Sequence, residues 1–302
     1  MTRRALRAVV LALLMAAGVG PAAAHALTVT DQTGRALELP GPPRRIVSLV
    51  PSVTEILYAL GQEEHLVGVT DFCDYPAAAR AKPSVGTMVG PSLEAIVALR
   101  PDLVVLTTAG NRDETFLQLQ RLRLPIYVVN PTSLAQALDL MEQLARLTGR
   151  PEAAGAVVGA LRRRVREVAA RVAPRPRPRV LYVVWPEPLV VPGRNAIVSE
   201  LIELAGGRSI TATSGEGYPR CSVEAAVAQG PEVILLARHA NPASPIAREQ
   251  WARFATLPAI RQGRMHDVDG NLLHRYGPRV VDGLERLARL LHPEAFPAER
   301  VK

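Results

Sequence analysis

One helix–strand segment of this chain occurs twice. Residues 92–106 align without a gap with residues 222–236, and seven of the fifteen positions are identical. Each copy begins with a serine that is placed to cap a short helix, has a glutamate in the first helical turn, and has a proline that ends the helix before an apolar strand. The same supersecondary unit is therefore predicted at two places in the chain.

The segments that precede the two copies also match each other in pattern. Residues 45–50 and 179–184 read as buried strands, and each leads through a proline-containing loop to a helix, the first ending near Gly61 and the second spanning residues 196–205. Buried strands that alternate with helices are typical of parallel sheets. The sequence therefore predicts an α/β fold with two related, Rossmann-like lobes.

A long helix is predicted between the lobes. Residues 151–172 carry apolar side chains near helical spacing, and Pro174, Pro176 and Pro178 end the pattern. A flexible hinge would more often be rich in glycine and serine, so we expect a rigid connection that limits opening and closing. The expected division is a first lobe at 27–150, the linking helix and its proline-rich exit at 151–177, and a second lobe at 178–302.

The N-terminal 26 residues have the order of a secretory signal peptide. Arg3, Arg4 and Arg7 precede an apolar run at residues 8–17, and small residues follow up to the cleavage region, where Ala24 and Ala26 are alternative sites. The run is too short to cross a bilayer. We therefore expect an exported protein that is soluble after cleavage.

The net charge gives no indication of a nucleic-acid partner. Loss of the three signal-peptide arginines lowers the formal charge from +8 to about +5. The remaining arginines are scattered over predicted helices and aromatic residues are few, whereas nucleic-acid-binding proteins usually have a clustered basic stripe. We interpret the charge as a solvated surface.

A ligand cleft is predicted where the two lobes face each other, because ligands of open α/β sheets bind beyond the carboxyl ends of the strands. The loops that this rule brings together are 51–54, 71–75, 86–90 and 109–111 from the first lobe, and 185–188, 217–221 and 271–275 from the second.

Several of these segments resemble the periplasmic vitamin B12-binding proteins. The resemblance is carried by residues 46–57, 67–76, 85–86, 92–94, 100–104, 219–224 and 276–279, and extends over essentially the whole mature chain. More broadly, the chain resembles the class III receptors for metal chelates, which include siderophore and haem binders. The resemblance implies a periplasmic, non-enzymatic and monomeric receptor without a resident cofactor, which delivers a metal chelate to an ABC transporter permease dimer with its ATPase.

Carried over position by position, the resemblance implies that the corrin contacts fall at Phe72, Thr87, Met88, Tyr218 and residues 271–275. Two segments depart from the pattern of the B12 binders: Met88 replaces an aromatic residue, and residues 271–275 read Asn-Leu-Leu-His-Arg in place of Asp-Trp-Phe-Glu-Arg. A corrinoid is therefore the first expectation for the ligand, and a ferric siderophore or haem is the alternative.

With the cleft loops added, the expected ligand-binding residues are Pro51, Ser52, Phe72, Cys73, Tyr75, Thr87, Met88, Trp185, Tyr218, Asn271, Leu272, His274 and Arg275. For Trp185 and Tyr218 the alternative is packing within a lobe. No set of histidines and carboxylates has the spacing of a bare-metal site, although His274 could reach a chelated metal. Cys73 and Cys221 are either free thiols or a disulfide that would cross the cleft.

The repeated glutamates Glu94 and Glu224 allow two interpretations. At a helix N-terminus a carboxylate stabilises the helix by about 0.3–1 kcal/mol. In the resembled receptors a glutamate on each lobe pairs with arginines of the permease, so the resemblance implies transporter docking. A periplasmic enzyme and a receptor that signals to a sensor are the rival functions; the sequence shows no phosphate loop, dinucleotide fingerprint or nucleophile elbow.

Overall fold

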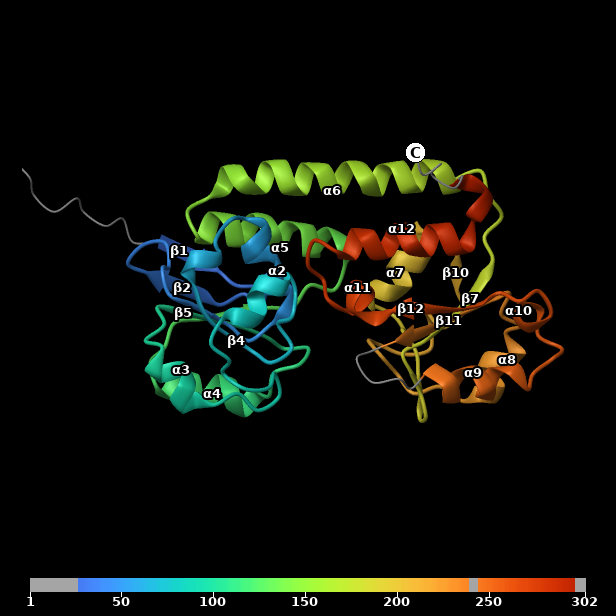
Figure 1. Cartoon of the computed structure of the whole chain (residues 1–302), viewed down its shortest axis with the longest axis horizontal. Coiled ribbons are helices and arrows are strands. Elements are labelled where there is room, and N and C mark those ends of the chain that lie inside the picture. Colours follow the sequence, from blue (N-terminus) through green and yellow to red (C-terminus); the bar gives the residue numbers. More distant parts are fainter. Residues whose placement is uncertain (1–26, 239–243, 297–302) are drawn as a thin grey trace, which may run out of the picture.

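The computed structural model describes residues 27–238 and 244–296 and has two α/β lobes bridged by one long helix, α6 (Pro151–Val172), as Figure 1 shows. The predicted signal peptide lies outside the described residues. No helix in those two described ranges is long and apolar enough to cross a membrane. The long helix has the bounds that the apolar spacing predicted.

The first lobe is built on a parallel sheet in the order β4-β3-β5-β6. Its strands are β3 (Ile46–Ser48), β4 (Leu66–Val69), β5 (Leu103–Thr107) and β6 (Ile126–Val129). Its helices are α2 (Pro51–Ala59), α3 (Leu93–Ala98), α4 (Asp113–Arg121) and α5 (Leu134–Leu147). An antiparallel hairpin of β1 (Leu27–Thr30) and β2 (Ala36–Leu39) precedes the sheet.

Successive side chains of the strands contact helices on opposite faces of this sheet. Leu103 and Val105 of β5 belong to a buried cluster with α2 and α5, whereas Val104 and Leu106 belong to a second cluster with α3 and α4. Because successive side chains of a strand point to opposite faces and both faces are covered by helices, most positions of the central strands are apolar. This explains the continuous apolar runs in the sequence.

The second lobe repeats this plan with the parallel order β10-β7-β11-β12. Its strands are β7 (Arg179–Val183), β10 (Arg208–Ser209), β11 (Val233–Arg238) and β12 (Met265–Asp269), and a hairpin is formed by β8 (Trp185–Pro186) and β9 (Leu189–Val190). Its helices are α7 (Ile197–Leu204), α8 (Val223–Ala228), α9 (Ser244–Ala252), α10 (Pro258–Arg261), α11 (Gly270–His274) and α12 (Val280–Leu291).

The internal repeat corresponds to α3–β5 in the first lobe and α8–β11 in the second. In both helices the predicted serine cap is present: Ser92 Oγ accepts a hydrogen bond from Ala95 N, and Ser222 Oγ accepts one from Ala225 N, each at 3.1 Å. The prediction of two related lobes with parallel sheets is confirmed.

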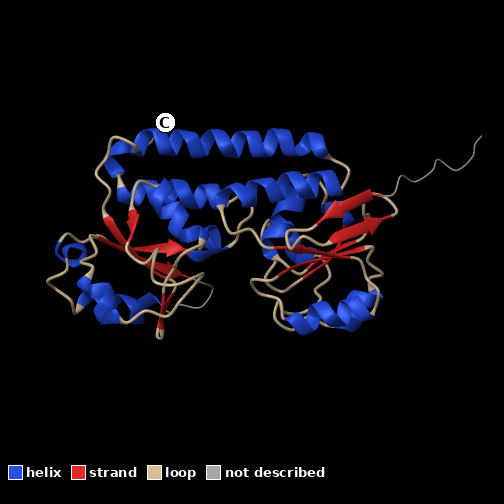
Figure 2. Ribbon diagram, turned by 180° about the vertical axis from the view of Figure 1, so that it is seen from behind, coloured by secondary structure: helices blue, strands red, loops and turns tan. Residues whose placement is uncertain are grey.

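The two lobes share one apolar core on the side of α6. That buried cluster contains side chains of α2 and α5 from the first lobe, α7 and α12 from the second, and α6 itself, which packs against both α5 and α12 (Figure 2). On the other side, each lobe has a core of its own. Rotation of one lobe against the other would expose the shared core to water, which supports the expected rigidity.

Four charged side chains cross the boundary between the lobes beside this core. Arg279 donates to both carboxylate oxygens of Glu55, at 2.6 and 2.9 Å, and Arg275 pairs with Asp74 and lies 3.8 Å from Glu55. Burial raises the pKa of the Glu55 carboxyl, and the hydrogen bonds and charge of Arg279 oppose that rise. We call Glu55, Asp74, Arg275 and Arg279 the interlobe ion cluster.

The two cysteines are not bonded to each other. Cys73 is buried in the shared core, where its sulfur accepts a hydrogen bond from Thr54 Oγ1 at 3.2 Å, and burial raises the pKa of its thiol. Cys221 is partly exposed near the start of α8. The free-thiol alternative is the one that the structure has.

We predict that Arg279→Ala lowers the free energy of unfolding by about 3 kcal/mol, because it leaves the Glu55 carboxylate buried without its partner. Urea denaturation measures the loss. Glu55→Gln on the Arg279→Ala background should recover part of it, since the unpaired charge is then gone. Arg162→Ala is the matched control: this partly exposed arginine pairs with Asp139 and Glu142 of α5, so about 1 kcal/mol or less is expected. Equal losses for the two arginines would contradict the prediction.

We also predict that Ellman's reagent titrates one thiol rapidly in the native protein and two in urea. Cys221 should react first because it is partly exposed, whereas Cys73 is buried. In the native Cys221→Ser variant the rapid reaction should disappear. Two thiols that react at the same rate in the native state would show that Cys73 is accessible.

Candidate functional site

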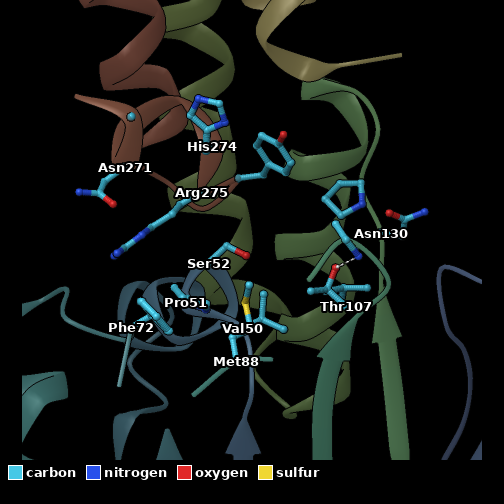
Figure 3. Close-up of a pocket in the computed structure, with 15 residues that line it drawn as sticks. Val50, Pro51, Ser52, Phe72, Met88, Thr107, Asn130, Asn271, His274 and Arg275 are labelled. Atoms are coloured by element: carbon cyan, nitrogen blue, oxygen red, sulfur yellow. Dashed lines mark hydrogen bonds between the residues drawn. The ribbon is translucent and has the colours of Figure 1, made fainter. Parts of the chain in front are cut away.

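A pocket of about 440 Å³ lies between the lobes at the carboxyl ends of their strands (Figure 3). The first lobe provides the ends of all four of its strands, and the described part of the second lobe provides the segment after β12. The lining consists of Val50, Pro51, Ser52, Phe72, Met88, Thr107, Ala109, Val129, Asn130, Pro131, Gly270, Asn271, His274, Arg275 and Tyr276. The predicted cleft is thus present, with unequal contributions from the two lobes.

The lining combines an apolar surface with a few polar groups. Val50, Phe72, Met88 and Val129 supply apolar contact area, and the polar groups are hydroxyls, two side-chain amides, His274 and Arg275. A pocket with this composition suits a partly apolar ligand that carries hydrogen-bonding groups at its edge.

Met88 is held in the lining by the loop that follows β5. Asn111 donates from Nδ2 to the Met88 carbonyl oxygen at 2.7 Å and accepts at Oδ1 from Thr107 N at 2.8 Å. A methyl group on Gly110 would overlap the Met88 side chain. The glycine therefore permits the close packing that fixes the position of Met88.

A second layer of aromatic residues supports the lining on the side of the second lobe. The Tyr182 hydroxyl and His274 Nε2 are 2.9 Å apart, and the hydroxyls of Tyr218 and Tyr276 are 2.7 Å apart. The rings of Tyr182 and Tyr218 each lie 5.7 Å from the His274 ring. Burial raises the pKa of all three tyrosines, so their hydroxyls stay protonated and hold the imidazole and Tyr276 in place.

Seven of the thirteen expected ligand-binding residues belong to this lining: Pro51, Ser52, Phe72, Met88, Asn271, His274 and Arg275. The other six lie outside it: Cys73, Tyr75, Thr87, Trp185, Tyr218 and Leu272.

The neighbours of those six residues explain their positions. Cys73 and Leu272 pack in or against the shared core, and the Tyr218 hydroxyl is hydrogen-bonded to the hydroxyl of Tyr276. Thr87 Oγ1 accepts from Gly90 N at 3.1 Å within an exposed turn. The Tyr75 ring lies 3.8 Å from the Arg279 guanidinium. Trp185 is exposed on the β8–β9 hairpin.

Sequence reasoning missed other lining residues, chiefly Thr107, Val129, Asn130 and Pro131. Val129 ends β6, and Asn130 and Pro131 directly follow that strand. The rule that ligands bind beyond the carboxyl ends of strands would have found Val129, Asn130 and Pro131 if it had been applied to β6 as well.

Glu94 and Glu224 are exposed on α3 and α8, which lie on the side of the two lobes away from α6 (Figure 1). Within the described ranges neither carboxylate has a hydrogen bond or an ion pair to a side chain. The same ranges hold no group of three or more His, Cys, Asp and Glu side chains that could bind a metal ion.

Comparison with known proteins identifies the family. Residues 46–272 match the family model described as periplasmic binding protein. A vitamin B12-binding protein from Vibrio cholerae serotype O1 is 30% identical over 255 residues, which cover 84% of this chain and 91% of that protein.

Solved structures agree with this assignment. The periplasmic vitamin B12-binding protein of Vibrio cholerae superimposes with a TM-score of 0.75 at 29% identity, covering 85% of this chain and 99% of that one. A periplasmic haem-binding protein from Pseudomonas aeruginosa gives a TM-score of 0.74 at 30% identity, covering 85% and 95%. The family match, the shared fold and the pocket between the lobes together show that this chain belongs to the periplasmic binding protein family.

Proposed function

We propose that this protein is the periplasmic substrate-binding protein of an ABC importer, which captures a corrinoid between its lobes and delivers it to the permease dimer and its ATPase. The observation that carries the proposal is an apolar pocket bounded by both lobes, in a chain that matches vitamin B12-binding relatives over most of their length. On this proposal the protein is a receptor and not an enzyme, and the ligand leaves it chemically unchanged.

The pocket chemistry fits a corrinoid in two respects. Phe72, Met88 and Val129 offer apolar area to the face of a macrocycle. The side chains of Asn130 and Asn271 can each donate and accept hydrogen bonds, which matches the amide groups at the edge of a corrin ring.

Haem or a ferric siderophore is the second candidate. It is favoured by the similarity to a haem-binding protein structure and by His274 and Tyr276 in the lining, because imidazole and phenolate side chains ligate haem iron.

We predict that the mature protein binds cyanocobalamin or cobinamide with a Kd of about 1 μM or lower, equivalent to about 8 kcal/mol of binding free energy. Isothermal titration calorimetry measures the affinity, with haem and a ferric siderophore titrated in parallel. No heat with either corrinoid, together with saturable binding of haem or the siderophore, would move the ligand to the second class.

Two aromatic substitutions act as a matched pair in this titration. Phe72→Ala should weaken binding by about 1–3 kcal/mol because its ring lines the pocket. Trp185→Ala should leave the affinity within twofold, about 0.4 kcal/mol, because this ring is exposed on the β8–β9 hairpin outside the lining.

We further propose that Glu94 and Glu224 dock the receptor on its transporter. Helix stabilisation explains a glutamate in the first turn of one helix. It does not require an exposed carboxylate at the same position in both lobes, on the side of the protein away from α6. One charge pair on each lobe would orient the receptor over a two-subunit permease.

We predict that Glu94→Ala and Glu224→Ala leave ligand affinity unchanged and reduce binding to the reconstituted transporter, with the double variant the weakest. The charge pairs should also make association of the parent protein sensitive to salt. Glu38→Ala, an exposed carboxylate on the β1–β2 hairpin, is the control that should change neither quantity. Normal complex formation and uptake with the double variant would disprove docking through these residues.

A further inference from the structure

Among the residues of 27–238 and 244–296 that line the pocket, Arg275 is the one with a permanently charged side chain. It projects from the second lobe toward the first, on the side of Phe72 (Figure 3). An unpaired guanidinium at this place would attract a ligand with a carboxylate at its edge. In this structure Arg275 is instead paired with Asp74, which comes from the first lobe and lies just outside the lining.

We propose that Asp74 is a specificity-determining residue, which masks the charge of Arg275 so that the pocket selects chelates with uncharged amide edges over chelates with carboxylate edges. The inference rests on the proposed function, and it names the chemical class of ligand that the site accepts.

Acidic and basic side chains are equal in number in the interlobe ion cluster around Arg275. Its guanidinium contacts Asp74 and lies 3.8 Å from Glu55, while both oxygens of Glu55 are occupied by Arg279. The interlobe ion cluster therefore holds two carboxylates and two guanidinium groups. Arg80 is the remaining cation nearby, at 3.7 Å from Asp74, but its side chain is 70% exposed and its charge is screened by water.

Asp74 stays ionised at neutral pH. Burial disfavours its charge, but the Arg275 guanidinium overcomes that effect and holds the pKa of the Asp74 carboxyl below its usual value. The Arg275 side chain is only 14% exposed, so the pair lies in a partly dry environment in which charges interact strongly.

This arrangement penalises an anionic ligand in two ways. A carboxylate that enters the pocket loses part of its hydration and finds the guanidinium already engaged. It also approaches the negative charge of Asp74. The repulsion between these like charges weakens the binding of the carboxylate ligand relative to that of an uncharged ligand. An amide group carries no charge and can bond to Asn130, Asn271 or Ser52 without disturbing the pair.

The test is Asp74→Asn, which keeps the shape of the side chain and removes its charge. Affinity is measured by calorimetry for two ligand pairs that differ in charge but share a metal and a macrocycle: cobyrinic acid against cobinamide, and haem against its diamide. We expect the parent protein to prefer the amide member of each pair that it binds. In Asp74→Asn the carboxylate member should gain about tenfold in affinity, or about 1.4 kcal/mol, while the amide member changes less than threefold.

Two further variants make the result specific. Arg80→Gln removes the exposed partner of Asp74 and should alter neither preference. Asp74→Ser is the second substitution in case the asparagine variant fails to fold, and circular dichroism and thermal unfolding confirm the folded state of each variant.

The outcomes separate this inference from the proposed function. If the parent binds no corrinoid, the proposed ligand is wrong, whereas the haem pair still measures the effect of Asp74. The inference is overturned if neither carboxylate ligand gains affinity in Asp74→Asn, if both members of a pair gain equally, or if the parent prefers a carboxylate member.

Discussion

The shared apolar core beneath α6 is the constraint on which the pocket depends. Side chains from α2 and α5 of one lobe and from α7 and α12 of the other belong to a single buried cluster, so on the side of α6 the two lobes complete one core together. The linking helix covers this cluster and does not merely join two independent units. Because the strand ends of both lobes are fixed relative to that core, the pocket is formed before any ligand arrives.

The interlobe ion cluster fixes the orientation of the two lobes at this apolar contact. The hydrophobic effect has no directional preference, whereas the two hydrogen bonds between Arg279 and Glu55 define one distance and one angle. Close approach of the backbone reinforces this geometry: a Cβ atom on Gly277 would lie 3.2 Å from both Glu55 Oε2 and the Ser52 carbonyl oxygen. A side chain on the residue that follows Tyr276 would therefore require Glu55 or the Ser52 backbone to shift.

The sequence was sufficient to predict the repeated strands and helices and the linking helix, because apolar periodicity, serine caps and prolines act locally; the β1–β2 and β8–β9 hairpins were not predicted. The strands near residues 45–50 and 179–184, the linking helix and the two copies of the repeat all appeared where their patterns placed them.

The pocket was predictable only in part. Which loops of the second lobe reach the cleft depends on how that lobe is rotated against the first, and no local pattern carries this information. Trp185 follows the end of β7 as the rule requires, yet of the predicted loops of the second lobe it is the loop at 271–275, after β12, that contributes to the lining.

The rigidity of the shared core has a consequence for transport. A receptor that closes around its cargo changes shape, and a transporter can recognise the closed form. A receptor whose lobes are held by one core would present α3 and α8, the helices that we propose for docking, in the same positions with or without cargo. Empty and loaded receptors would then compete for the same transporter on nearly equal terms. Discrimination between them would have to come from the cargo itself, exposed at the mouth of the pocket, and uptake would slow when empty receptor is in excess.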